Sequence, residues 1–380
     1  MKFLALSLVL FSQATFATVC TPTNLVTEPN SPFQKIPVYD QDGSNICYAY
    51  VTSQLLDYNL MKKGVQERTA HPLWLAMNHG KYAIKNVPNE KNRTMIGTGN
   101  VRRTIESLKT YPVCSFDAVD KSLAQMAKAA KTKDSEVVQF IETYTQKLGA
   151  IEEGRALAAL EGREANLDDI DIIAMIKETK SDADMRWCSS NATWDALLPL
   201  LRNLHAVTTP EMVEKLLFQA CQNKQFNLQA PKANLKIFGE TDGIVTGQIA
   251  QVMDTIKAPV SVSYCAKALT QPNLQGITYR NPDGGKLQYA NGCEHHESII
   301  VGKKQVGNSC QLLLRNTWGS NFGTWTKGKK CLCKNRQTGA YLDDCNSTAH
   351  NNGQYTVEGC WIDEGVINRN AYQMTYLDPK

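Results

Sequence analysis

Hydrophobic and polar positions follow a helical period in the first half of this chain and a strand-like period in the second. The first clear segment is residues 45–64, where apolar side chains recur at spacings of three and four. Ser44 or Asn45 is placed to cap its first turn, and Gly64 follows its last turn. The pattern therefore predicts a helix whose first turn contains Cys47.

A long central block has an almost purely helical pattern. Within residues 115–225, apolar side chains recur at i, i+3, i+4 and i+7, most clearly over residues 135–148. Before this block, residues 65–114 are mixed, with a turn-rich loop at 96–100 and a helical run at 101–111. We interpret residues 115–225 as a helical subdomain inserted into a larger domain.

Beyond residue 233 the pattern changes to short segments rich in β-branched and aromatic residues. Five segments are predicted to form strands and their turns: 258–265, 296–302, 309–319, 354–367 and 371–377. Together they indicate a largely antiparallel sheet in the second half of the chain. The fold class predicted from these patterns is α+β, with a helical half and an antiparallel β half.

Residues 1–17 have the three-part pattern of a secretory signal peptide. Lys2 supplies the charge, residues 3–11 are apolar, and Thr15 and Ala17 are the small residues before a cleavage site. The alternative is a buried N-terminal strand or helix. Because no later run reaches about 18 consecutive apolar residues, no membrane anchor is expected. We expect the mature protein to be secreted or periplasmic.

Composition and charge narrow the class of partner. The chain has 42% apolar and 21% charged residues, which is ordinary for a globular protein, and a formal net charge of +4. It contains no long run of one charge, so nucleic acid is not an expected partner. Twelve cysteines in an exported chain predict disulfides. If one cysteine stays free, the even total leaves a second one unpaired.

The chain carries the residue types that a nucleophilic thiol requires. A reactive cysteine needs a base, a group that orients the base, and donors for a developing oxyanion. His296 offers the base and Asn316 the orienting amide. Gln41 and the backbone N–H of Cys47 offer the donors, and a helix N-terminus favours the thiolate. Each residue also has a structural reading, as a buried thiol, a core histidine or a turn residue.

No metal is predicted from the remaining histidines and cysteines. His295 lies beside His296, but no third histidine or spaced carboxylate accompanies the pair. Cys331 and Cys333 are spaced like part of a zinc knuckle. In an exported chain with further cysteines nearby, disulfides are the favoured reading.

The candidate residues resemble the motifs of the papain family of cysteine peptidases. Gln41 precedes Cys47 by six residues, as in the family's Q-G-x-C-G-S-C-W-A. His296 precedes Gly302 by six residues, which is the offset of the family's histidine motif. Asn316 opens N-T-W-G-S-N-F-G, which is close to the family's N-S-W-G-x-x-[WF]-G.

The spacing of these motifs agrees with the resemblance once the central block is set aside. Papain-type His and Asn residues follow the Cys by about 130–150 residues. Here His296 and Asn316 follow Cys47 by 249 and 269 residues, and removing the central block leaves 138 and 158. The matches cover roughly residues 40–114 and 233–323.

The resemblance implies a papain-like two-half fold with an inserted α-helical subdomain. Its expected parts are a signal peptide at 1–17, a mainly helical part at 18–114, the insertion at 115–225 and a β half at 226–380. The site would lie in the cleft between the helical half and the β half.

The function implied by the resemblance is that of a secreted cysteine endopeptidase acting on protein or peptide substrates. Cys47 would be the nucleophile, resting as a thiolate beside a protonated His296 that Asn316 orients. Trp318 would shield the bond between His296 and Asn316 from water and contact the substrate. The Gln41 side chain and the Cys47 N–H would form the oxyanion hole. No cofactor is expected.

Departures from the family pattern lie beside the motifs. Tyr48 stands where the family has a tryptophan, and Ser44 stands where it has a disulfide cysteine. Glu297 replaces a small residue that helps form the second substrate subsite, so we expect a preference for a basic side chain there. Gly97 and Gly99 of the turn-rich loop are also expected to bind substrate.

Two other functions remain open from the sequence. One is a transamidase or other acyl-transfer enzyme that uses the same pair of residues. The other is a non-catalytic binding protein that keeps the fold. The helical insertion is expected to restrain the enzyme, to position it on a protein substrate or to bind a partner.

Overall fold

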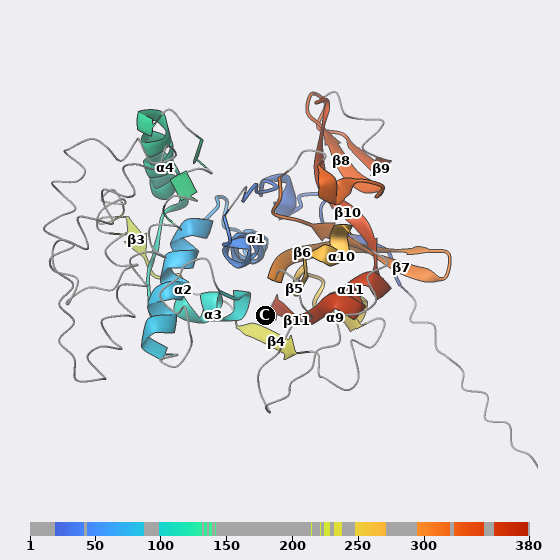
Figure 1. The fold of residues 1–380 in the computed structure, drawn as a ribbon, viewed down its shortest axis with the longest axis horizontal. Helices are drawn as coiled ribbons and strands as arrows, with labels where there is room; N and C mark the ends of the chain where they lie inside the picture. The colour runs from blue at the N-terminus through green and yellow to red at the C-terminus, as the bar shows by residue number, and fades with distance from the viewer. Residues whose placement is uncertain are drawn as a thin grey trace, which may run out of the picture.

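The computed structural model describes both halves of the chain and the base of the central block. It covers residues 20–41, 44–86, 99–130, 133–134, 137–138, 141, 214, 221, 224–228, 232–237, 248–270, 295–319, 323–345 and 353–378. Within these residues a group of helices lies beside an antiparallel sheet, with α1 between them (Figure 1). The predicted α+β class with a helical half and a β half is confirmed. The expected signal peptide lies outside the described residues.

The β half is built on one sheet of nine strands. Eight strands follow the order β4-β11-β5-β6-β7-β10-β8-β9, and the short β1 pairs with β6. The strands are β1 Thr23–Asn24, β4 Ala233–Ile237, β5 Val260–Cys265, β6 His295–Val306, β7 Ser309–Arg315, β8 Cys331–Asn335, β9 Tyr341–Cys345, β10 Tyr355–Asp363 and β11 Ala371–Leu377. Every pairing is antiparallel.

Helices cover this sheet and form the other half. The α-helices are α1 Cys47–Lys62, α2 Pro72–Asn86, α3 Val101–Ser107, α4 Phe116–Ala130, α9 Gln248–Ile256, α10 Lys267–Thr270 and α11 Glu364–Asn370. Two 3₁₀ turns are η1 Pro32–Gln34 and η4 Thr324–Thr326. Both α1 and α11 pack against β5, which is buried along its whole length.

The central helix α1 is buried on all sides, from Cys47 to Asn59. It contacts α2 and α3 in the helical half and β6 in the sheet, so no face is left for solvent. Its N-cap is Ile46, which makes no side-chain cap bond. The predicted cap at Ser44 or Asn45 is therefore wrong, and the helix begins at Cys47 itself. Neighbouring elements, rather than a polar cap, stabilise this buried start.

The two ends of the central block are brought together at its base. Strand β2, Val113–Cys114, pairs with β3, Gln225–Phe226, and a disulfide joins Cys114 to Cys221. Only α4 and a few residues of the block are described, so the inserted subdomain stays a prediction. Paired ends are what an inserted segment requires, because the chain must leave the main domain and return to it at neighbouring positions.

One expected segment differs in type. The segment 354–367 is not one strand and turn, because it divides into β10 and the helix α11. The Asp363 side chain accepts a hydrogen bond of 2.8 Å from the Gly365 N–H, which caps that helix. The segment 309–319 forms a strand as far as Arg315, and the chain then leaves the regular strand, as expected for a strand that ends in a turn.

Disulfides fasten the outer strands and the N-terminal segment. The described bonds are Cys20–Cys310, Cys114–Cys221, Cys331–Cys360 and Cys333–Cys345. Cys265 is also disulfide-bonded, whereas Cys47 is a free cysteine. The predicted use of cysteines for disulfides is therefore confirmed, including at Cys331 and Cys333. Among the described residues, none of the helices is both long and apolar enough to cross a lipid bilayer.

Candidate active site

Cys47 lies at the junction of α1 and the sheet. Its side chain is only 9% exposed, and its sulfur accepts a hydrogen bond from the backbone N–H of Glu297 on β6. Burial, with a smaller contribution from the nearby Glu297 carboxylate, raises the pKa of the thiol to about 12. The helix N-terminus does not offset this loss of hydration. The expected resting thiolate is thus disfavoured in this arrangement.

His296 on β6 is held by Asn316, the residue that directly follows β7. The His296 Nε2 atom and the Asn316 Oδ1 atom are 2.6 Å apart. The Thr317 backbone N–H donates to the same Oδ1 atom at 2.8 Å, and the Ser298 hydroxyl donates at 3.3 Å. That atom is therefore the amide oxygen, and Nε2 carries the proton that it accepts. The neutral His296 ring consequently keeps Nδ1 as a proton acceptor.

Trp318 packs against the ring of His296. The centroids of the His296 and Trp318 rings are 4.4 Å apart, and the Tyr264 ring lies 5.7 Å away on another side of the histidine. His296 is 3% exposed, and this burial lowers its pKa to about 4, although the Asn316 bond acts in the opposite direction. Burial therefore favours the neutral imidazole, as it favours the neutral thiol of Cys47.

Glu297 is a buried carboxyl group next to Cys47. It is 4% exposed, and the Ser263 hydroxyl donates a hydrogen bond of 2.7 Å to its Oε1 atom. The pairing of β5 with β6 places Ser263 directly opposite Glu297. Burial raises the pKa of this carboxyl, and hydrogen bonds from Ser263, the Val101 N–H and Gln373 offset only part of the rise, so that the pKa is about 7. Glu297 is thus poised to change charge near neutral pH.

Gln41 is fixed beside the Asn316 loop. Its backbone N–H donates to the Thr317 carbonyl at 2.8 Å, and its side-chain oxygen accepts a bond from the Thr317 hydroxyl. The side-chain nitrogen donates to the Ser44 carbonyl at 2.7 Å. One N–H of the amide therefore already has a partner, and the second N–H is the donor left for an oxyanion.

Of the two glycines expected to bind substrate, only Gly99 belongs to the described residues. A Cβ atom at Gly99 would overlap the Tyr48 ring, so the glycine allows close packing beside the residue that follows Cys47. Gly97 lies outside the described residues, and its expected role stays a prediction.

A buried arginine that sequence reasoning missed anchors the Asn316 strand. Arg315 is fully buried, and its guanidinium donates to Glu358 at 2.7 Å, to Gln54 at 3.0 Å and to the Ile36 carbonyl. These bonds tie the end of β7 to β10 and to α1, and they fix the position of the next residue, Asn316. The only signal in the sequence is a charged residue within the apolar run LLLRN.

No metal centre is assembled around these residues. Among the described residues, no group of three or more His, Cys, Asp or Glu side chains is placed to hold a metal ion. The second histidine, His295, instead places its Nδ1 atom 2.7 Å from the Tyr372 hydroxyl. The absence of a metal or cofactor from the chemistry remains a prediction.

Comparison with known proteins gave structural likenesses only. No family model and no curated protein matches the sequence. Xylellain, a cysteine protease from Xylella fastidiosa, has 12% identity and a TM-score of 0.35, with 90% of this chain and 85% of that chain covered. The bromelain protease from Ananas comosus has 11% identity and a TM-score of 0.36, with coverages of 94% and 97%. Procathepsin B S9 from Trypanosoma congolense has 11% identity and a TM-score of 0.37, with coverages of 94% and 77%.

At these identities and scores, the likenesses carry no argument about chemistry. Inference about chemistry has to come from the residues of this chain, chiefly Cys47, His296 and Asn316.

Proposed function

We propose that this protein is a cysteine endopeptidase that cleaves peptide bonds through Cys47 and His296. The observation that carries the proposal is the hydrogen bond of 2.6 Å between His296 and Asn316. The Trp318 ring packs against His296, and the next residue of β6, Glu297, contacts the free thiol of Cys47. The bond with Asn316 leaves the other ring nitrogen of a neutral histidine as a base. Asn316 is a positioning residue, because it acts through His296.

The proposed reaction starts from a neutral pair rather than a preformed ion pair. As the Cys47 sulfur attacks the substrate carbonyl carbon, the thiol proton passes to Nδ1 of His296. The Cys47 N–H and the second N–H of Gln41 would stabilise the oxyanion. His296 then gives the proton to the leaving amine, and the C–N bond breaks to leave a thioester. Water, deprotonated by His296, hydrolyses the thioester and restores the thiol.

Glu297 is proposed to select a basic side chain in the second substrate subsite. Its carboxyl is buried next to Cys47, where it accepts a bond from Ser263 and retains a second oxygen without a hydrogen-bond partner among the described residues. A cationic side chain that reached this oxygen would gain a charge-assisted bond. Peptides differing only in Arg, Leu or Glu at this position test the idea. Equal cleavage of the three would contradict it.

The cellular location and the role of the insertion are proposals as well. The described disulfides suit an oxidising compartment, so we propose that the protein is secreted or periplasmic. The paired base at Cys114 and Cys221 supports a separate role for the central block in regulation or in contacting a protein substrate. Unchanged folding, secretion and protein cleavage after its deletion would argue against such a role.

Labelling with a cysteine-directed epoxide at about pH 6 tests the Cys47–His296 pair. Ordinary thiols are almost fully protonated at this pH and react slowly. We expect an adduct on Cys47, found by mass spectrometry, that forms at least about tenfold more slowly in His296→Ala. The matched control is His295→Ala, which changes the neighbouring histidine and should label at the normal rate. Equal labelling of both variants would contradict the proposed base.

A second candidate function is a binding protein that keeps the fold without catalysis. The deep burial of Cys47 and the use of one Gln41 N–H by Ser44 favour this alternative. Incubation with a peptide pool, with Cys47→Ala as the control, separates the two. New termini that require Cys47 indicate a peptidase, and amide products with an added amine indicate a transamidase. An intact peptide pool would leave binding as the function.

A further inference from the structure

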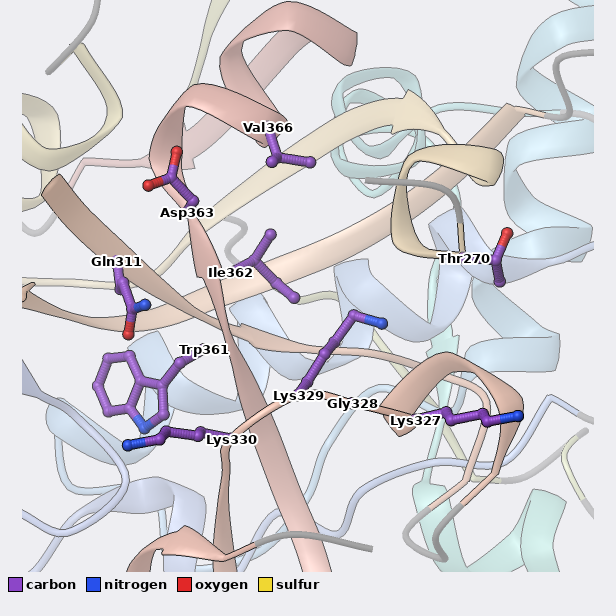
Figure 2. A pocket seen from close by; sticks show the side chains of 10 residues that line it. All are labelled: Thr270, Gln311, Lys327, Gly328, Lys329, Lys330, Trp361, Ile362, Asp363 and Val366. Atoms are coloured by element: carbon purple, nitrogen blue, oxygen red, sulfur yellow. The ribbon is translucent and has the colours of Figure 1, made fainter. Parts of the chain in front are cut away.

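A concave site lies in the β half, and Cys47 is not among the residues that line it. It is a cavity of about 410 Å³ between the loop that follows η4 and the strand β10 (Figure 2). Trp361, Ile362 and Val366 supply apolar parts of its lining, and Lys327, Lys329 and Lys330 supply three ammonium groups. We refer to this cavity as the lysine pocket. Its volume lies within the range of sites that hold small organic ligands.

The lysine pocket is distinct from the candidate active site. It uses Gln311 of β7, whereas His296 is held by Asn316, which lies five residues further along the chain. At roughly 3.3 Å per residue along a strand, that separation is on the order of 15 Å. None of the residues lining the lysine pocket belongs to the constellation around Cys47. The inference below therefore does not rest on the proposed function.

Two of the lysines around Trp361 are already neutralised by acidic residues of β9. Lys304 lies 4.1 Å from the centre of the Trp361 ring and pairs with Asp343 and Asp344, at 3.1 and 2.6 Å. Lys330 pairs with Asp344 at 3.3 Å. These pairs satisfy the positive charge on one side of the lysine pocket.

Among the residues that the structure describes, no acidic side chain neutralises Lys327 or Lys329 in this way. Within the described part of the chain, neither ammonium forms an ion pair. Asp363 also lines the cavity, but one of its oxygens caps α11 through the Gly365 N–H. The cavity therefore contains more positive charge than its acidic residues balance.

Lys329 is the most enclosed lysine of the three. It is half-buried, and this loss of hydration lowers the pKa of its ammonium group. Its backbone N–H bonds to the Thr326 carbonyl at 3.0 Å, and Cys331, two residues on, is fixed by its disulfide to Cys360. In Figure 2 its side chain points toward the part of the cavity lined by Ile362, whereas Lys327 and Lys330 extend in opposite directions. An anion in the cavity would restore the lost solvation of this ammonium.

We propose that the lysine pocket binds an organic monocarboxylate, with its carboxylate on Lys329 and its apolar body against Trp361, Ile362 and Val366. A carboxylate suits the pocket better than a phosphate, because the single negative charge is repelled less by Asp363. Gln311 and Thr270 supply further hydrogen-bonding groups at the rim. Such a carboxylate has two sources, a free small acid or the C-terminus of a polypeptide.

The test is a calorimetric or NMR titration of the folded full-length mature protein with 3-phenylpropionate. We expect saturable binding with a Kd from roughly 0.1 to a few millimolar, which is usual for a ligand of this size. The matching amide, 3-phenylpropionamide, should bind at least about fivefold more weakly, because it lacks the charge. Binding of the amide with equal affinity, or no saturation with the acid, would overturn the proposal.

Variants of one lysine locate the site. Lys329→Met keeps the length and apolar stem of the side chain, and we expect it to weaken binding of 3-phenylpropionate about five- to tenfold. Lys329→Arg should restore most of the affinity, since it restores the charge. The matched control is Lys109→Met, at an exposed lysine of the helical half. Unchanged affinity in a Lys329→Met protein that keeps the wild-type circular dichroism spectrum would overturn the proposal.

Two further titrations identify the ligand class and its source. Inorganic phosphate should bind more weakly than the carboxylate, and tighter phosphate binding would overturn the assigned class. A short peptide ending in Phe is compared with its C-terminal amide, using Cys47→Ala to prevent cleavage. Binding of the peptide with a free C-terminal carboxylate, but not of its amide, supports the site and assigns a polypeptide C-terminus as the ligand. Binding of 3-phenylpropionate without the peptide supports it and assigns a free acid.

Discussion

The candidate active site and the lysine pocket differ in how far their ionisable groups are exposed to water. Around Cys47, burial raises the pKa of the thiol and of Glu297 and lowers the pKa of His296. Each shift favours the neutral form of the group. Around Trp361, by contrast, the lysines are exposed or half-buried, and acids of β9 form ion pairs with only Lys304 and Lys330.

This difference follows from where the two sites lie in the fold. The Cys47 site lies between a helix that is buried on all sides and a strand that is buried on both faces, so each charge there loses its water. The lysine pocket is formed by a loop and one end of the sheet, where water still reaches the ammonium groups. Substitutions around Cys47 should therefore change the protonation of neighbouring groups. Substitutions in the lysine pocket should change the electrostatic attraction of a ligand, which salt screens.

The largest expected effect comes from replacing the buried carboxyl in Glu297→Gln. In the wild type, the folded-state pKa of about 7 lies above the ordinary value of 4.5. Between these two pH values the folded protein keeps a proton that the unfolded chain releases, so stability falls as pH rises. The full loss is on the order of 3 kcal/mol, reached above the folded-state pKa. The glutamine keeps an oxygen for Ser263 but does not titrate, so this loss should disappear.

Urea unfolding of the wild type and of Glu297→Gln at pH values from about 4.5 to 8 measures the effect. The variant should gain stability relative to the wild type as pH rises, with most of the gain reached near pH 8. Glu67→Gln is the matched control, because Glu67 is exposed and should give a constant difference across the pH range. Parallel curves for Glu297→Gln would mean that Glu297 is hydrated, and the contrast between the two sites would fail.

The sequence predicted the residues of the candidate site better than their electrostatics. The motifs located Cys47, His296 and Asn316 because motif offsets depend only on short-range backbone geometry. They could not predict the charge states, which depend on Ser263 lying opposite Glu297 in the sheet. Strand register is a long-range property, and here it joins residues 34 positions apart.

The fold shows the same division between local and long-range information. The class and most strands of the β half followed from hydrophobic period. Helix α11 was missed because its residues continue an apolar, strand-like run, and the choice of helix depends on the Asp363 cap. Likewise, the start of α1 at Cys47 needs no polar cap because neighbouring elements bury it. Partners such as Glu358 for Arg315 become visible only once the strands are paired.

The smallest expected effect is that of salt. It should weaken ligand binding in the lysine pocket and leave the labelling rate of Cys47 almost unchanged. Raising NaCl from about 50 to about 500 mM shortens the range of electrostatic attraction between partly exposed charges. We expect the affinity of the lysine pocket for 3-phenylpropionate to fall about two- to fivefold. The rate at which an uncharged epoxide labels Cys47 should change by less than about 1.5-fold, because its buried groups are neutral and poorly screened. Equal salt dependence at both sites would show that the two regions do not differ in hydration, and it would remove the basis of the comparison.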